Sequence, residues 1–268
     1  MHVIILTKRI LYKADMLKHI SLFFYKYNMK YKYLNKILLD WNSSEDIQDN
    51  SIIKSSDIKG MKEIDSYNVN GVKFKMIRMK HIKPNFYLGE TLVTKELWKA
   101  VMGYSLPANE DKDPKVPANN IAPYSLCKKF LDTLNIITGY NFRIPTEKEW
   151  EDCVGDFIRK HFNNKRPFDD PENELLHKIA WNCQNSEKTL QPVASKEPNE
   201  YGLYDMLGNS WEWCLKYYQS SGMSAFVARG GSYKISPDEM SATNVWGNIC
   251  SFGGDANGIG IRLALDLN

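Results

Sequence analysis

The sequence predicts a mixed helix-and-strand domain with little regular secondary structure, preceded by a basic helical extension and a polar linker. Between Tyr67 and Cys153, a hairpin pattern is followed by three helix patterns. After Pro171, short apolar pieces alternate with Gly, Asn, Ser and Pro, which favours loops and short strands. The 268 residues are 43% hydrophobic and 25% charged, a globular balance with room for one large domain plus an appendage.

Residues 1–42 are expected to form a basic amphipathic helical extension. Apolar residues fall near helical spacing at Leu22, Tyr25, Met29, Tyr33 and Ile37. Residues 1–40 carry eight Lys and Arg against two Asp, a net charge of +6, so residues 41–268 carry about −3. The extension suits peripheral contact with an anionic membrane or a partner. The alternative is a packed helix, or an upstream extension translated from a misplaced start codon. The body is not expected to bind nucleic acid.

Residues 43–66 are rich in Ser and Asp and are assigned to a polar linker, so the domain proper is expected to span 67–268. The segment VNGVKFKMIRM alternates apolar and polar residues around the Asn70-Gly71 turn signal, which predicts a β-hairpin.

Three helices are expected next. The first starts after an N-cap at Thr94 and stops at Gly103. The second covers residues 123–138. The third is capped by Thr146, and Glu149 three residues later completes a capping box.

The five cysteines have no metal-ligand spacing, so we expect reduced, mostly buried thiols and no zinc module. No apolar run approaches the roughly 20 residues that span a bilayer. The stretch 3–6 is too short for a secretory signal. The expected location is therefore cytoplasmic.

Four segments form a specific signature: FYLGETLVTKELWKAVMG (86–103), LCKKFLDTLNIITGYNFRIPTEKEWEDC (126–153), QPVASKEPNEYGLYDMLGNSWEWC (191–214), and RGGSY with GIRLAL (229–233 and 260–265). In this order and spacing they resemble the formylglycine-generating enzyme, or sulfatase-modifying factor, family. The resemblance implies an α+β fold, the family's variant of the C-type lectin fold, over about residues 67–268.

The resemblance also shows a departure. Enzymes of this family carry two redox cysteines, two and seven positions after the aromatic that follows RGGS, which bind copper(I). Here the aromatic is Tyr233, and those positions hold Ile235 and Met240. Neither side chain forms a thiolate, so we expect no copper, no catalytic residues and no formylglycine-generating activity.

The family also carries structural calcium. Carried over, one site takes the carbonyls of Leu207, Gly208 and Ser210 and the carboxylate of Glu212. The alternative is that an arginine, Arg143 or Arg262, or backbone amides hold Glu212. A second family site begins at Asn182 with the Cys183 carbonyl, but we do not expect it here, because the chain lacks the longer loop that completes it.

Relatives of this fold in phage and gut bacteria display a variable surface just before a GIRLAL-like end, which implies a bacterial binding protein. The corresponding stretch here is 234–259. Its expected ligand-binding residues, for a protein or small molecule, are Asp238, Glu239, Asn244, Trp246, Asn248, Phe252, Asp255 and Asn257. Loop residues that merely close the fold are the alternative.

The leading hypothesis is thus a catalytically inactive binding scaffold. The alternative is a metal-dependent oxidoreductase of the same family, using non-haem iron or copper at an unrecognised site. The five histidines show no ligand spacing that would build such a site.

Overall fold

The computed structural model describes residues 64–106, 113–121, 124–162, 173–218, 223–240, 245–246 and 258–267. All of them belong to one compact unit, Lys62–Asn268. The predicted extension 1–42 and the linker up to residue 63 lie outside the described residues. Among those described, no helix has the length and apolar character needed to cross a membrane.

The predicted hairpin is present and begins earlier than expected. Strands β1 (Ile64–Val69) and β2 (Val72–Arg78) pair antiparallel, and Asn70 and Gly71 both have positive φ in the turn. Residues 64–66 were assigned to the linker, which is wrong. Side-chain exposure alternates along β1, which is the edge strand of its sheet. Edge strands tolerate polar residues such as Asp65 and Ser66, and in the sequence these two residues resemble the polar linker before them.

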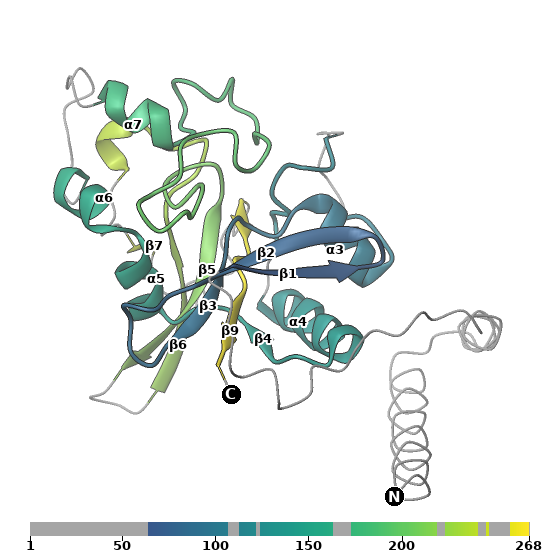
Figure 1. Cartoon of the computed structure of the whole chain (residues 1–268). Helices are drawn as coiled ribbons and strands as arrows, with labels where there is room; N and C mark the ends of the chain where they lie inside the picture. The colour runs from purple at the N-terminus through teal and green to yellow at the C-terminus, as the bar shows by residue number, and fades with distance from the viewer. Residues whose placement is uncertain are drawn as a thin grey trace, which may run out of the picture. The chain divides into compact units, whose positions relative to one another are not determined.

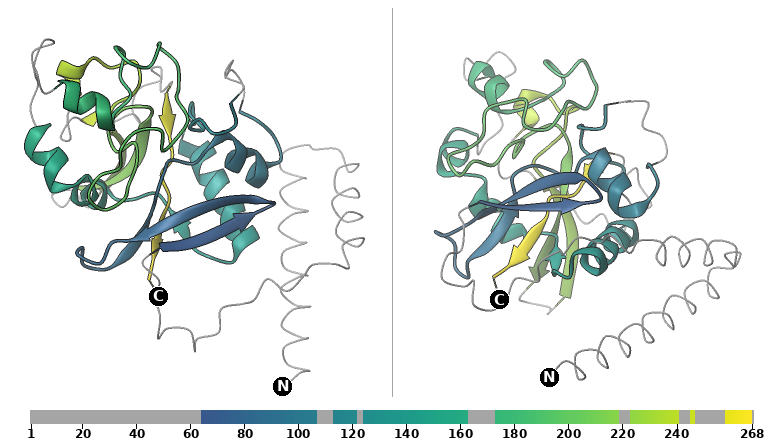
Figure 2. Two further views of the ribbon diagram at one scale, coloured as in Figure 1. Left: turned by 45° about the horizontal axis from the view of Figure 1, so that its top comes forward. Right: turned by 45° about the vertical axis from the view of Figure 1, so that its right-hand side comes forward.

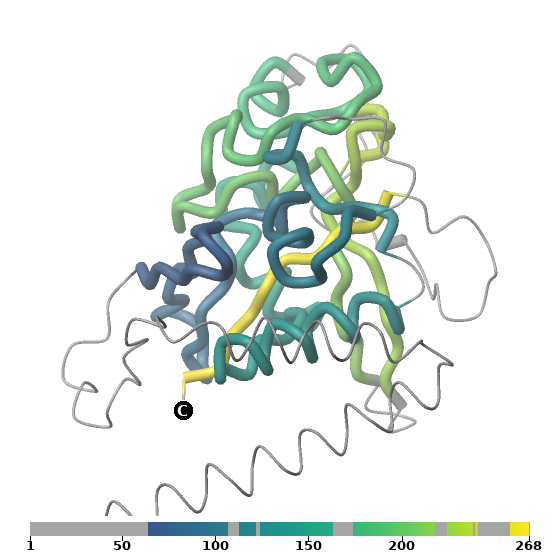
Figure 3. The backbone as a smooth tube through the Cα atoms, turned by 90° about the vertical axis from the view of Figure 1, so that its right-hand side faces the viewer, coloured from purple at the N-terminus to yellow at the C-terminus, as the bar shows by residue number. Residues whose placement is uncertain are grey.

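Two sheets are joined by the C-terminal segment. The five-stranded sheet has the order β1-β2-β3-β9-β4, with β3 (Phe86–Gly89), β9 (Ala264–Asp266) and β4 (Phe142–Arg143). The four-stranded sheet has the order β7-β6-β5-β8, with β7 (Val245–Trp246), β6 (Met223–Arg229), β5 (Trp211–Tyr218) and β8 (Ile259–Gly260). Strands β8 and β9 are consecutive in the chain, so the segment 259–266 contributes one strand to each sheet. Figure 3 shows this segment running through the middle of the domain.

The three predicted helices are confirmed. Helix α3 (Lys95–Met102) is capped by Thr94 and ends at Gly103 with φ of 74°. Helix α4 (Tyr124–Thr138) follows. Helix α5 (Glu147–Cys153) has the full Thr146–Glu149 capping box. Two short helices, α6 (Asp156–His161) and α7 (Asn173–Ile179), and a 3-10 turn, η2 (Pro237–Glu239), complete the described elements.

The helices divide the core into two clusters. Helices α3 and α4 lie beside the β1–β2 hairpin, and α5, α6 and α7 lie on the other side of the domain, as Figures 1 and 2 show. The first cluster includes Trp98, Phe130 and Trp213. The second includes Trp150, Leu207 and Met240. Between the two clusters, Glu212 at the start of β5 contacts Arg262 of the C-terminal segment.

Candidate functional site

Glu212 is a fully buried carboxylate at the start of β5, with an exposed fraction of 0%. Strand alternation places Trp213 in the first core cluster, and Trp211 packs against that cluster too, so Glu212 faces the second cluster. There it accepts a hydrogen bond from the indole Nε1 of Trp150 at 2.9 Å. A buried carboxylate is tolerated only when it is paired and hydrogen-bonded.

Arg262 supplies the charge partner. Its Nη2 lies 2.7 Å from Glu212 Oε1 and its Nε lies 2.9 Å from Oε2. The guanidinium also donates to the carbonyls of Gly89, Glu90 and Tyr204, at 2.9, 3.1 and 2.7 Å. The second arginine considered from the sequence, Arg143, instead pairs with Glu149 and Asp266.

These contacts do not fit the calcium site that the resemblance implies. Both oxygens of Glu212 accept hydrogen bonds from cationic or indole donors. A calcium ion about 2.3–2.6 Å from the same oxygens would lie beside a guanidinium of like charge. The backbone at Gly208 serves packing, because a Cβ there would overlap the Trp181 carbonyl. The geometry therefore supports the alternative, a carboxylate held by an arginine.

Asn182, the first residue of the implied second calcium site, holds a turn. Its Oδ1 accepts from the Gln184 N–H at 2.9 Å, and its carbonyl accepts from the N–H groups of Asn185 and Ser186. Asn182 is fully buried, and its oxygens are already satisfied by the chain. Nothing in this turn requires an ion.

The two positions that replace the redox cysteines are packed with apolar side chains. Met240 is 1% exposed within the second core cluster, and Ile235 packs against the same cluster. The preceding RGGS segment is held by Arg229, whose buried guanidinium lies over the Trp150 ring and pairs with Glu147 and Glu151. Ile235, Met240 and Arg229 therefore serve the packing of the second core cluster.

Three of the four described cysteines are shielded from solvent, and the fourth, Cys183, is partly buried. Cys127, Cys153 and Cys214 are buried, and burial raises the pKa of each thiol, so they stay protonated at neutral pH. Within the described ranges, no three His, Cys, Asp or Glu side chains gather in a way that could hold a metal ion.

The expected binding stretch is anchored at both ends. At its start, the Ile235 carbonyl accepts from the Cys183 N–H at 3.1 Å, and Met240 is buried. At its end, the Gly258 N–H donates to Asn120 Oδ1 at 2.6 Å, and its carbonyl accepts from Ser210 Oγ at 3.1 Å. The segment between Met240 and Gly258 is thus tied to the core at two fixed points.

Most predicted ligand-binding residues in this stretch cannot be placed. Glu239 is exposed in the η2 turn and accepts from Ser236 Oγ at 3.2 Å. Trp246 lies on β7, where its backbone pairs with Ala228. The side chains of Asp238 and Trp246 lie outside the description, as do Asn244, Asn248, Phe252, Asp255 and Asn257 altogether. Their role in binding stays a prediction.

One feature of the structure is not predicted by the sequence: a cavity beside α3. It is lined by residues of α3, of the β1–β2 turn and of two loops, none of which carries a recognisable motif. Trp98 lies on the buried, apolar face of α3, and no sequence pattern indicates that its indole also borders a cavity.

Comparisons with known proteins show which family this domain belongs to. The family described as "Sulfatase-modifying factor enzyme 1-like domain" matches residues 63–267. The chain is 33% identical over 96 residues to a protein of Mus musculus named inactive C-alpha-formylglycine-generating enzyme 2. That match covers 34% of this chain and 31% of the mouse protein. It is 30% identical over 118 residues to the formylglycine-generating enzyme of Streptomyces coelicolor, covering 34% and 36% of the two chains.

The chain thus spans about a third of the length of these two relatives. Among solved structures, it is similar to Treponema denticola variable protein 1, with a TM-score of 0.60 and 24% identity. That match covers 77% of this chain and all of the other. At this identity the likeness shows the fold alone. Because the family match covers three quarters of the sequence, the chain belongs to the family of sulfatase-modifying factor enzyme 1-like domains.

Proposed function

We propose that this domain is a non-catalytic scaffold that binds a protein or small-molecule ligand through the surface formed by residues 234–257. The observation that carries the proposal is the packing of Met240 and Ile235 in the second core cluster. Active members of the family are expected to hold a copper-binding thiolate pair at these positions. Here both are apolar, and Met240 is sealed from solvent.

The anchoring of the stretch supports a binding role. A segment fixed at both ends on a rigid core can vary in sequence without disturbing the fold, which is how many proteins present binding loops. The likeness to a protein named a variable protein agrees with this arrangement. We also propose that the scaffold is the lectin-like variant that the family resemblance implies.

The alternative of an iron- or copper-dependent oxidoreductase gains no support from the residues that the structure describes, because they offer no cluster of metal ligands. Contact with anionic membranes through residues 1–42 concerns residues outside the description and stays a prediction.

The binding role is tested with peptide and glycan arrays. The full chain is compared with a variant whose residues 241–257 are replaced by a Gly-Ser segment of equal length. The matched control is Lys128→Gln, which removes an exposed i,i+4 ion pair with Asp132 on α4. We expect array signals that Lys128→Gln keeps and that the replacement abolishes. Signals that survive the replacement, or no signal from the full chain, would contradict the proposal.

A further inference from the structure

The Asn70-Gly71 turn between β1 and β2 carries two groups that can react with each other. Both residues are exposed, and their φ angles are 49° and 87°. A Cβ built on Gly71 would meet no atom within 4 Å, so the space around its backbone is open. In an asparagine–glycine pair the backbone nitrogen of the glycine can approach the asparagine amide closely, because glycine has no side chain to obstruct it. The turn is therefore a candidate site of chemical modification.

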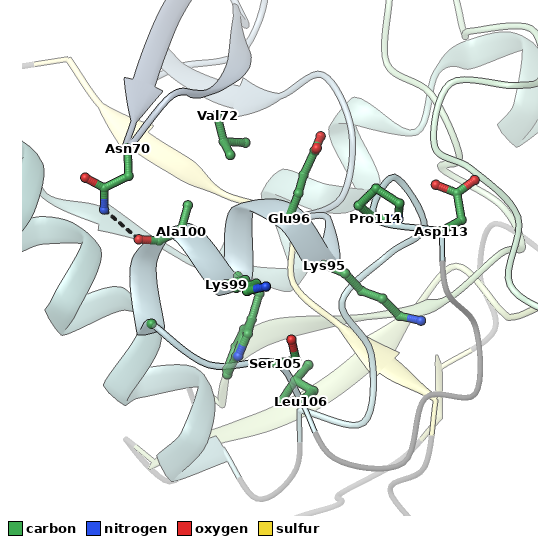
Figure 4. A pocket seen from close by; sticks show the side chains of 12 residues that line it. Asn70, Val72, Lys95, Glu96, Lys99, Ala100, Ser105, Leu106, Asp113 and Pro114 are labelled. Atoms are coloured by element: carbon green, nitrogen blue, oxygen red, sulfur yellow. Dashed lines mark hydrogen bonds between the residues drawn. The ribbon is translucent and has the colours of Figure 1, made fainter.

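The side-chain amide of Asn70 holds the end of α3. It donates from Nδ2 to the Ala100 carbonyl at 2.8 Å, as Figure 4 shows. Ala100 is one of the last four residues of α3, and the carbonyls of such residues have no donor within the helix. The Lys99 carbonyl accepts from the Gly103 N–H, and the Ala100 carbonyl accepts from Asn70. Asn70 thus caps the C-terminal end of α3 from a neighbouring element.

The backbone nitrogen of Gly71 is held as well. Its N–H donates to Asn68 Oδ1 at 2.9 Å. The Asn70 amide meanwhile points to the end of α3, so the two groups that would react are engaged in different hydrogen bonds. Reaction between them requires the turn to open first. These two hydrogen bonds therefore control how often the amide and the nitrogen can meet.

A carboxylate in place of the Asn70 amide would be unfavourable here. Deamidation replaces a side chain that donates hydrogen bonds with an ionised one that only accepts them. The new charge would face the Ala100 carbonyl oxygen at the C-terminal end of α3, where the helix dipole is negative. The hydrogen bond would be lost and the carboxylate repelled, so the contact between the hairpin turn and α3 would break.

We propose that Asn70 is a site of spontaneous deamidation, gated by these two hydrogen bonds, and that the product releases the hairpin turn from α3. The Gly71 nitrogen bonds to Asn70 Cγ while the Cγ–Nδ2 bond breaks, and the Gly71 N–H proton leaves with the amide group as ammonia. Water then opens the resulting succinimide, which leaves aspartate or isoaspartate at position 70. No oxidation or reduction occurs, and water is the co-reactant.

Peptide mapping by mass spectrometry measures the reaction in the full chain, kept at neutral pH for several weeks. The reference is the free peptide SYNVNGVKF, residues 66–74, in which the fold does not hold the turn. We expect the full chain to convert about 10- to 100-fold more slowly than the peptide. Asn68→Ala removes the acceptor of the Gly71 N–H and should raise the rate in the full chain about fivefold. Conversion at the rate of the peptide, no detectable conversion, or an unchanged rate in Asn68→Ala would overturn the proposal.

Two variants with the same added charge test the consequence for the fold. Asn70→Asp places a carboxylate at the end of α3, whereas Asn68→Asp adds one to the same hairpin and keeps an oxygen that accepts from the Gly71 N–H. We expect Asn70→Asp to lower the thermal unfolding midpoint by about 4 °C or more, and Asn68→Asp to change it by less than about 1 °C. Equal midpoints for the two variants would contradict the release of the turn from α3. Neither experiment bears on the 241–257 replacement, because the turn and that stretch share no residue.

Discussion

Trp98 and Trp150 are two fully buried indoles that differ in what their N–H groups contact. Trp150 donates to the buried carboxylate of Glu212, whereas Trp98 has no acceptor among the described residues. In Trp98→Phe, the lost volume costs about 1–2 kcal/mol, and removal of an unsatisfied donor offsets about 1–3 kcal/mol. We therefore expect the free energy of unfolding to stay within about 1 kcal/mol of the wild type.

Trp150→Phe is the matched control for this comparison. It removes similar volume and also a hydrogen bond to a charged group, so it should destabilise the protein by about 2 kcal/mol more than Trp98→Phe. Urea unfolding monitored by circular dichroism measures both changes. Equal losses in the two variants would show that the Trp98 N–H is satisfied in the folded protein.

The environment of Glu212 shows how far single residues can be predicted. Because side chains alternate in a strand, Glu212 points away from Trp211 and Trp213 on β5. An arginine partner for this carboxylate was one of the alternatives that the sequence offered, and it is the one observed. The choice between Arg143 and Arg262 could not be made from the sequence. It depends on β8 pairing with β5, a contact between residues about 50 positions apart.

At the scale of elements, Asp205 ties two loops of the second half together. Its Oδ2 accepts from the Ala194 N–H at 3.0 Å. Its Oδ1 accepts from Asn209 Nδ2 at 3.4 Å, and Asn209 in turn pairs with the backbone of Gln191. Burial raises the pKa of Asp205 from 3.8 to about 6, although the Ala194 N–H and Arg262 act in the opposite direction.

This shift predicts a pH dependence of stability. Because the folded pKa lies above the unfolded value, the contribution of Asp205 is complete below about pH 4. It falls as the pH rises to about 6, by at most about 3 kcal/mol. We expect Asp205→Asn to flatten this part of the curve of unfolding free energy against pH, measured in urea between pH 4 and 7. A variant curve parallel to that of the wild type would contradict the shift.

The helices and their caps could be predicted from the sequence, whereas the order of the strands in the sheets could not. The caps of α3 and α5 depend on residues three positions apart, so Thr94 and the Thr146–Glu149 box could be identified directly. The insertion of β9 between β3 and β4 joins segments that are more than 100 residues apart. No periodicity in a three-residue strand indicates its neighbours. The strand order of the irregular second half was therefore not predicted.

At the scale of the whole molecule, we expect the Glu212–Arg262 ion pair to make a structural ion unnecessary at residues 208–213. Since Arg262 already neutralises Glu212, chelation should not weaken the fold at this point. We expect the thermal unfolding midpoint of the full chain to be the same, within about 1 °C, in 1 mM EDTA and in 1 mM calcium chloride. A calcium-dependent rise of several degrees would mean that calcium binds the folded state, as mass action requires.

Packing at the positions of the expected redox pair is the basis of the proposed scaffold role. Met240 and Ile235 fill the place of the redox pair, Arg229 is engaged by two glutamates, and the stretch 241–257 starts and ends at anchored residues. The core keeps the fold of the family, and we propose that the surface carries the function.

The most direct test of this account is a copper(I) titration of the full chain, followed by oxygen consumption with a cysteine-containing peptide and a thiol reductant. We expect no stoichiometric copper binding that survives a competing chelator, and no oxygen uptake above the peptide-free rate. One tightly bound copper per chain together with peptide-dependent oxygen consumption would contradict it, because a catalytic centre would then exist without the cysteine pair.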